Sequence, residues 1–317
     1  MHIKSENLYL HDANLKLSRQ IHAPACARRL ALGTAQFGIH YGIANVLGQV
    51  SYEEAEAMLL MARNAGIDTL DTAIAYGEAE SLLGCIGVSD FQLISKIPAI
   101  REPTGSGEDW VQIQVESSLS RLRVNRLKGL MLHAPDDLLG PHGLSIARGM
   151  QRVKDAGLVE FLGLSVYSPE QLAAVIDFLP LEIIQIPLNI FDRRFVESGW
   201  LDRLTQQGIE VHARSAFLQG LLLMASEKVP SIFKPFSQII DNWHAWLAKQ
   251  SPEISPVQAC ISHVASYSGI SRIVVGADTR GQLQEILIAA SLNSRQAPAC
   301  LSSPATALIN PSEWSTL

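Results

Sequence analysis

The chain has 317 residues, of which 47% are hydrophobic and 18% are charged, and its formal net charge is −6. This composition supplies enough apolar side chains for a buried core and excludes an intrinsically disordered chain. The acidic balance argues against a nucleic-acid-binding surface, which needs clustered basic residues. No stretch approaches the roughly eighteen apolar residues that a membrane span requires.

The cysteines and the first residues of the chain indicate the cellular compartment in which we expect the protein. The four cysteines lie far apart and form no C-x-x-C pair: Cys26, Cys85, Cys260 and Cys300. Such spacing in a chain of this length is typical of free thiols in a reducing compartment. Because the sequence starts without the long apolar segment of a secretory signal, we expect a cytoplasmic protein.

Residues 1–28 are polar and weakly patterned, which predicts an N-terminal extension or cap. Residues 29–317 then contain no linker, low-complexity tract or second core, so we expect them to form one domain. The first helix of this domain is expected at 52–65, where apolar residues recur at helical spacing. Ser51 as N-cap, with Glu54 three residues later, predicts a capping box at its start.

One strand–helix unit recurs along the domain. Strand-like apolar runs are expected at 29–36, 68–73, 91–97, 127–134, 159–166, 182–189, 210–216 and 272–277. Helical patterns are expected at 52–65, 79–86, 108–123, 144–156, 169–179, 197–207, 256–267 and 281–291. The strands are continuous apolar runs, as expected when both faces of a sheet are covered. Eight strands, each followed by a helix, predict an α/β fold with a single closed (β/α)8, or TIM, barrel.

One connection is longer than the others. It joins the seventh strand, at 210–216, to the helix at 256–267 and contains Trp243 and Trp246 among other apolar residues. Long connections in compact domains are usually functional or disordered. Because this one has enough apolar side chains to pack, we expect a long helical loop that acts as a lid after strand 7.

Four polar residues follow neighbouring strands of the predicted barrel. Asp71 ends the second strand, Lys96 the third and His133 the fourth, and Tyr76 lies in the loop after the second strand. The carboxyl ends of parallel barrel strands meet at one mouth, where the active sites of such barrels lie. We therefore expect these four side chains to lie close together.

These residue types suit the reduction of a carbonyl group. A lysine cation close to a tyrosine lowers the pKa of the phenol, and an aspartate paired with the lysine orients it. A neutral histidine donates a hydrogen bond to a substrate carbonyl. Such a group would supply a proton and stabilise an oxyanion, and a nicotinamide cofactor would supply the hydride.

Four segments carry a resemblance to a known family: LGTAQFG at 32–38, DTAIAYGEAE at 71–80, ISK at 94–96 and LH at 132–133. In order and spacing they resemble the aldo-keto reductase superfamily, over about residues 29 to 291. The resemblance implies a barrel that binds NADPH or NADH across its mouth, without a Rossmann domain. It also implies that Tyr76 is the general acid, that Lys96 and Asp71 tune it, and that His133 orients the carbonyl.

The resemblance extends to residues around the nicotinamide. It implies that Ser165 and Gln185 hold the carboxamide, although Val166 replaces the usual asparagine. It also implies cofactor contacts from Gly33, Thr34 and Ser215 in the matching motifs. At the place of the usual stacked aromatic ring stands Arg214, whose guanidinium would stack on the nicotinamide, contact an anionic substrate or pair with a neighbouring acid.

The segment at the eighth strand departs most from the family. Gly276 and Gln282 stand where a lysine and an arginine would be expected to hold the 2′-phosphate of NADPH, which leaves Arg280 as the cation. Backbone amides at a helix N-terminus still suit a phosphate, whereas Asp278 would repel a 2′-phosphate. The resemblance therefore leaves open the choice between NADPH and NADH. The cofactor contacts it implies here are Gly276, Ala277, Asp278, Arg280 and Gln284.

Several alternatives remain open at this point. Residues 33–48 resemble reductases of bacterial sugar metabolism, which favours a small-molecule, sugar-like carbonyl substrate. A lyase that forms a Schiff base on Lys96 would use the same barrel. A non-catalytic, reductase-like regulatory subunit would keep the fold alone. No metal-ligand spacing is present, and the sequence does not indicate an oligomeric state.

Overall fold

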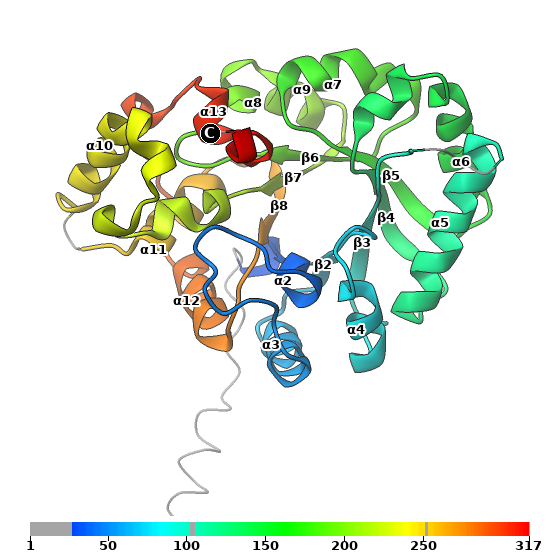
Figure 1. Cartoon of the computed structure of the whole chain (residues 1–317), viewed down its shortest axis with the longest axis horizontal. Helices are drawn as coiled ribbons and strands as arrows, with labels where there is room; N and C mark the ends of the chain where they lie inside the picture. Colours follow the sequence, from blue (N-terminus) through cyan, green and yellow to red (C-terminus); the bar gives the residue numbers. More distant parts are fainter. Residues whose placement is uncertain (1–26, 102–104, 251–252, 317) are drawn as a thin grey trace, which may run out of the picture.

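Eight parallel strands close on themselves in chain order, and the predicted (β/α)8 barrel is confirmed (Figure 1). The structure, a computed structural model, describes residues 27–101, 105–250 and 253–316. Most of the predicted extension, residues 1–28, lies outside the described residues. The strands are β1 (Leu30–Gly33), β2 (Thr69–Asp71), β3 (Gln92–Ile97), β4 (Leu127–Leu132), β5 (Val159–Ser165), β6 (Ile183–Pro187), β7 (Glu210–Arg214) and β8 (Ile270–Val275).

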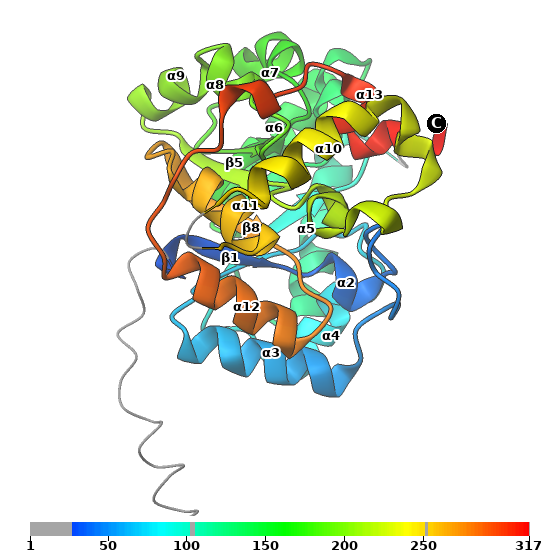
Figure 2. The same ribbon diagram turned by 90° about the vertical axis from the view of Figure 1, so that its left-hand side faces the viewer.

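Helices ring the outside of the barrel and follow the predicted pattern closely (Figures 1 and 2). The outer helices are α3 (Tyr52–Asn64), α4 (Ala79–Ile86), α5 (Gly107–Leu122), α6 (Gly143–Asp155), α7 (Pro169–Val175), α9 (Trp200–Gln206), α11 (Pro256–Ala265) and α12 (Arg280–Ala290). The helix expected at 197–207 is interrupted, because Gly199 adopts a φ of 77° between α8 (Arg194–Glu197) and α9.

The interior of the barrel is filled by side chains. Ile94, Met131 and Ile183 from three strands form a buried cluster, with Phe161 packed against it. Gly129 on β4 lies among them, and a Cβ added there would lie 2.7 Å from Ile183 Cδ1 and 2.8 Å from Ile94 Cδ1. The barrel is therefore a packed core, and any ligand must bind at one of its ends.

The long connection after β7 is helical, as predicted. It contains the 3-10 segments η4 (Leu218–Leu223), η5 (Ser226–Lys228) and η6 (Ser231–Phe236), followed by α10 (Ser237–Leu247). The segment after α12, for which the sequence pattern predicts no element, crosses towards this insertion (Figure 2). It contains η7 (Ala299–Leu301), α13 (Thr306–Ile309) and η8 (Pro311–Thr316). Trp314 packs edge-on against Phe233 with ring centroids 4.9 Å apart, which anchors the insertion.

Within the described part of the chain, none of the helices is both long and apolar enough to cross a membrane.

Candidate active site

A buried ion pair lies at the carboxyl ends of β2 and β3. Lys96 Nζ donates to Asp71 Oδ1 at 2.6 Å and to the carbonyl oxygen of Thr72 at 3.0 Å. Gln185 on β6 donates to the other oxygen, Oδ2, at 2.7 Å, so both carboxylate oxygens are engaged. Burying two charges costs desolvation energy that only good geometry and additional hydrogen bonds offset. This pair has both, which fixes the orientation of Lys96 and Asp71.

Tyr76 and His133 lie next to this ion pair. Their ring centroids are 5.8 Å apart, with an edge-to-face angle of 84°. Lys96 Nζ lies 5.5 Å from the centre of the Tyr76 ring. The structure therefore brings together the four side chains that the sequence places at successive strand ends.

The electrostatics favour neutral forms of both Tyr76 and His133. Burial raises the pKa of Tyr76 above its usual value, Asp71 raises it further, and Arg214 lowers it. The expectation that Lys96 lowers this pKa is wrong, because burial dominates and Lys96 is paired with Asp71. Burial, followed by the charges of Lys96 and Arg214, lowers the pKa of His133 to about 4. At neutral pH, Tyr76 is therefore a proton donor and His133 a neutral imidazole.

Arg214 ends β7 and its guanidinium is held on two sides. The guanidinium carbon lies 4.2 Å from the centre of the Tyr167 ring. Its Nη2 donates to the carbonyl oxygen of Val166 at 3.1 Å and its Nη1 to Ser215 Oγ at 3.2 Å. Within the described ranges no acid forms an ion pair with it, so the predicted alternatives of stacking and of anion binding remain.

The backbone that follows Arg214 is strained. Ser215, Leu218 and Gln219 adopt positive φ angles of 61°, 48° and 52°. Residues other than glycine rarely adopt such angles, and they do so mostly where a functional site requires it. This concentration next to Arg214 supports the assignment of the site.

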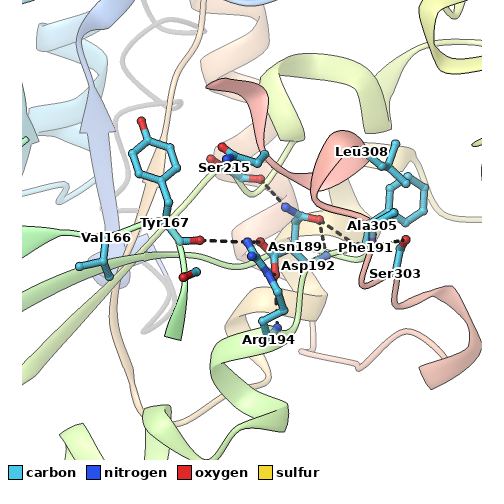
Figure 3. A network of polar contacts seen from close by, with 12 residues as sticks. Val166, Tyr167, Asn189, Phe191, Asp192, Arg194, Ser215, Ser303, Ala305 and Leu308 are labelled. Atoms are coloured by element: carbon cyan, nitrogen blue, oxygen red, sulfur yellow. Dashed lines mark hydrogen bonds and ion pairs between the residues drawn. The ribbon is translucent and has the colours of Figure 1, made fainter. Parts of the chain in front are cut away.

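Asn189 holds this strained segment in place. Its Nδ2 donates to the carbonyl oxygen of Ser215 at 3.2 Å, and its Oδ1 accepts from the backbone amides of Phe191 and Asp192 (Figure 3). Asn189 has no exposed surface. Its role depends on a contact 26 residues along the chain, which the sequence pattern does not reveal.

A second ion pair, between Asp192 and Arg194, supports the loop that carries Tyr167. Asp192 pairs with Arg194 at 2.9 Å, and Arg194 Nη2 donates to the carbonyl oxygen of Tyr167 at 2.9 Å (Figure 3). This bond holds the loop whose Tyr167 ring lies under the guanidinium. The charged run Asp192-Arg193-Arg194, five residues after the end of β6, is the sequence signal that could have indicated this pair.

A cavity of about 400 Å³ extends from Asp71 and Tyr76, two of the four predicted catalytic residues, towards the N-terminus of α12. At one end it is lined by Asp71, Tyr76 and Gln185, and at the other by Asp278, Gln282 and Glu285. Between them it is lined by further residues that include Gly33, Thr34, Tyr41, Arg214, Ser215 and Gly276. A cavity of this size is typical of small-molecule and cofactor sites.

The loop after α2 borders this cavity and contacts the loops after β7 and β8. Asn45, in the loop after α2 (Ala35–Gly38), donates through Nδ2 to Asp278 Oδ1 at 3.1 Å and to the carbonyl oxygen of Gly48 at 2.9 Å. In the loop after β7, Gly220 has a φ of 91°, and a Cβ there would overlap Ala44. The close approach therefore requires glycine at 220.

The residues implied for the nicotinamide contacts lie at the inner end. Ser165 Oγ donates to Gln185 Oε1 at 3.1 Å, and Gln185 in turn donates to Asp71. Thr34 binds the carbonyl oxygen of Asp71 through its amide at 2.9 Å and its hydroxyl at 3.1 Å. Ser165 and Gln185 thus form a chain of hydrogen bonds that ends on the ion pair.

At the outer end the structure separates the implied residues. Asp278 and Gly276 line the cavity, whereas Ala277 is buried and Gln284 is exposed on the outer surface of α12. A Cβ at Gly276 would overlap the side-chain amide of Gln36, so Gln36 fills the place of the lysine expected from the family.

Arg280 is engaged by an acid from a different helix. Glu54 Oε2 lies 2.9 Å from Arg280 Nε, and Glu54 Oε1 accepts from the Arg280 backbone amide at 2.5 Å. The predicted capping box at α3 is therefore half right. Ser51 Oγ accepts from the Glu54 amide, but the Glu54 carboxylate turns to Arg280 at the start of α12. The two helices lie side by side in both views (Figures 1 and 2).

Comparisons with known proteins find related sequences. The chain is 28% identical over 193 residues to 6-dehydroglucose reductase from Novosphingobium aromaticivorans, covering 53% of this chain and 60% of that protein. It therefore spans less than two thirds of this relative. It is 25% identical over 290 residues to a probable voltage-gated potassium channel subunit beta from Arabidopsis thaliana, covering 81% and 87% of the two chains.

The fold has solved counterparts. The holo form of aldo-keto reductase AKR11C1 from Bacillus halodurans matches with a TM-score of 0.66 at 17% identity, covering 86% of this chain and 89% of that one. The sequence model of the aldo/keto reductase family matches residues 29–300. The chain therefore belongs to the aldo/keto reductase family.

Proposed function

We propose that this protein is an NAD(P)H-dependent oxidoreductase that reduces an aldehyde or ketone to an alcohol. The observation that carries the proposal is that Tyr76 lies between His133, which it contacts edge-on, and Lys96 of the buried Lys96–Asp71 pair. Curated relatives of the family with reductase names support it.

The residues along the cavity suit a nicotinamide dinucleotide. Arg214 presents a planar guanidinium beside Tyr76, and Ser215 supplies a hydroxyl next to it. At the far end Asp278 presents a carboxylate, an acceptor that suits the hydroxyls of a ribose. When bound, the reduced nicotinamide would supply the hydride.

The chain's own residues then handle the proton and the developing charge. Tyr76 gives its phenolic proton to the substrate oxygen as that oxygen becomes an alkoxide. A raised pKa keeps Tyr76 protonated until that moment. Neutral His133 donates a hydrogen bond to the same oxygen and fixes the carbonyl. Arg214, the cation that lowers the pKa of Tyr76, stabilises the phenolate that is left behind.

The Schiff-base alternative is disfavoured by the surroundings of Lys96. Its side chain has no exposed surface, and its ammonium group donates to Asp71 and Thr72. Attack on a carbonyl needs an exposed, neutral amine. Borohydride trapping of a substrate on Lys96 would contradict this reasoning.

A sugar-like carbonyl is the substrate that we propose. The name of the Novosphingobium relative, a 6-dehydroglucose reductase, supports this choice. The test is to measure oxidation of NADH and NADPH with a panel of aldehydo and keto sugars, using the wild type and Tyr76→Phe. Dinucleotide binding without turnover of any carbonyl would instead favour a regulatory subunit, a possibility raised by the channel-subunit relative.

A further inference from the structure

We infer that the substrate carries a carboxylate, and that the guanidinium of Arg214 binds this group beside the proton donor Tyr76. The inference rests on the proposed function, because it names the class of carbonyl compound that the same site reduces: an aldehydo or keto acid, such as a sugar acid. The juxtaposition that carries it is a guanidinium without an acid partner among the described residues, in a cavity that Tyr76 also lines.

The hydrogen bonds of Arg214 leave part of its guanidinium without a protein acceptor. Two other arginines that form no ion pair within the described ranges, Arg29 and Arg193, bind backbone carbonyls through all three of their side-chain nitrogens. Arg214 uses only Nη1 and Nη2, each for one bond, and its Nε has no acceptor in the described part of the chain. A guanidinium has five N–H donors, of which two are used here, so three remain for a ligand.

The charge of Arg214 is the one that a ligand at this end of the cavity would meet. Arg214 is the single cation among the described residues that line the cavity, and the nearby Asp71 is already paired with Lys96. The guanidinium lowers the pKa of Tyr76 and that of His133, so its charge acts on both groups that would hold the carbonyl. An anionic group on Arg214 would therefore lie close to the reacting carbonyl of the same molecule.

The charge balance favours a carboxylate over a phosphate. A carboxylate has a single negative charge, which matches the one unpaired cation. A phosphate ester, with a charge of about −2, would leave excess negative charge in a cavity that Asp278 and Glu285 also line. Tyr41 lines the same cavity, and burial raises its pKa to about 12, which keeps its hydroxyl protonated as a second donor.

The orientation of Arg214 is fixed before any ligand binds. Its guanidinium lies over the Tyr167 ring, and Arg194 holds the Tyr167 carbonyl oxygen from the other side (Figure 3). The next residue, Ser215, has a φ of 61° and is held by Asn189. A bidentate bond between a guanidinium and a carboxylate needs such a fixed plane. Because the donors lie along the edge of the guanidinium, this bond leaves the face opposite Tyr167 open to a stacked ring.

The test compares acids with neutral amides of the same shape. The two pairs are glucuronate with glucuronamide and pyruvate with pyruvamide, and kcat/KM is measured at saturating dinucleotide. We expect the wild type to prefer the acid by about 10-fold or more in at least one pair, and Arg214→Gln to lose that preference. Arg203→Gln is the matched control, because Arg203 also lies on an aromatic ring, that of Trp200, but outside the cavity.

Binding without turnover gives a second readout. Gluconate has a carboxylate but no carbonyl, and calorimetric titration should show that it binds the wild type and Arg203→Gln at least about 10-fold more tightly than Arg214→Gln. If Arg214→Gln fails to fold, Arg214→Lys keeps the charge without the planar fork, and the preference for acids should fall about threefold or more.

The outcomes separate the inference from the reductase proposal. Equal kcat/KM for acid and amide in both pairs, or a preference that survives in folded Arg214→Gln, would overturn the inference alone. A preference for glyceraldehyde 3-phosphate over glyceraldehyde, without one for either acid, would also overturn it. If no carbonyl is turned over, gluconate binding that depends on Arg214 would keep the carboxylate site and contradict the reductase. Absence of both turnover and binding would overturn both.

Discussion

An ion pair lies beside each end of the cavity, and the two pairs differ in burial. Lys96 and Asp71, at the inner end, are 0% and 5% exposed, whereas Arg280 and Glu54, at the outer end, are 58% and 24% exposed. In both pairs a carboxylate oxygen lies within hydrogen-bond distance of a cationic nitrogen. Solvent screens the outer pair and not the inner one, so loss of the inner pair should reduce the free energy of unfolding far more.

This difference separates the two ends of the cavity. The inner pair is held by additional bonds from Gln185 and Thr72, so its geometry is fixed before any ligand arrives. Catalysis benefits from such preorganisation. The outer pair joins two helices at the surface. A single substitution in the outer pair should therefore cost little stability.

The largest expected effect comes from breaking the inner pair. Asp71→Asn leaves the Lys96 charge buried without a counter-ion, which should lower the free energy of unfolding by about 3–5 kcal/mol. Urea denaturation followed by circular dichroism measures the change. A loss below about 1 kcal/mol, the range of surface pairs, would show that the inner pair is as well screened as the outer one.

Removal of the phenol should affect turnover alone. In Tyr76→Phe we expect kcat/KM for carbonyl reduction to fall about 100-fold or more, since general acid catalysis contributes at least that much. Tyr52→Phe, at an exposed position on α3, is the matched control. The affinity for the dinucleotide should change by less than about threefold. Unchanged turnover in Tyr76→Phe would refute the assignment of the proton donor.

Because the pKa of His133 is low, we expect kcat/KM to change little with pH on the acidic side of its profile. Its pKa of about 4 lies below the usual 6.5, so the neutral form persists down to about pH 5. We expect kcat/KM to fall less than about threefold between pH 8 and 5, whereas an ordinary histidine would lose about 30-fold. The same shift means that its contribution to stability is complete above pH 6.5 and is lost as the pH falls towards 4. A kcat/KM profile with a break near pH 6.5 would contradict this.

The smallest expected effect concerns the stability of the outer pair. Glu54→Gln should lower the free energy of unfolding by less than about 1 kcal/mol, and 1 M salt should remove most of the difference. The measurement is the same urea denaturation that is used for Asp71→Asn. A loss as large as that of Asp71→Asn would remove the contrast between the two ends of the cavity.

The barrel and the inner group were predictable because their signals are local. Each strand is a short apolar run, and Asp71, Lys96 and His133 stand where such runs end. Parallel topology then brings strand ends together without further information. The direction of the Tyr76 pKa shift was not predictable, because it depends on how deeply the folded chain buries the ring.

The outer end was harder to predict, since its contacts join distant parts of the chain. Glu54 and Arg280 are 226 residues apart, and the local pattern favoured a capping box. Ser255 and Gln258 show the box that the pattern predicts, with both hydrogen bonds formed at the start of α11. At α3, by contrast, the Glu54 carboxylate binds Arg280 from a distant part of the chain. Gln36 likewise fills the space at Gly276 from a separate segment.

Gly129 carries a consequence for random mutagenesis. A bulky side chain at this position would collide with Ile183 and Ile94 in the middle of the barrel. Such variants should yield little folded enzyme, since overpacking of a closed interior is costly. A colony screen scored by activity would therefore group Gly129 with Tyr76, although it touches no ligand. Only the yield of soluble protein would tell the two classes of variant apart.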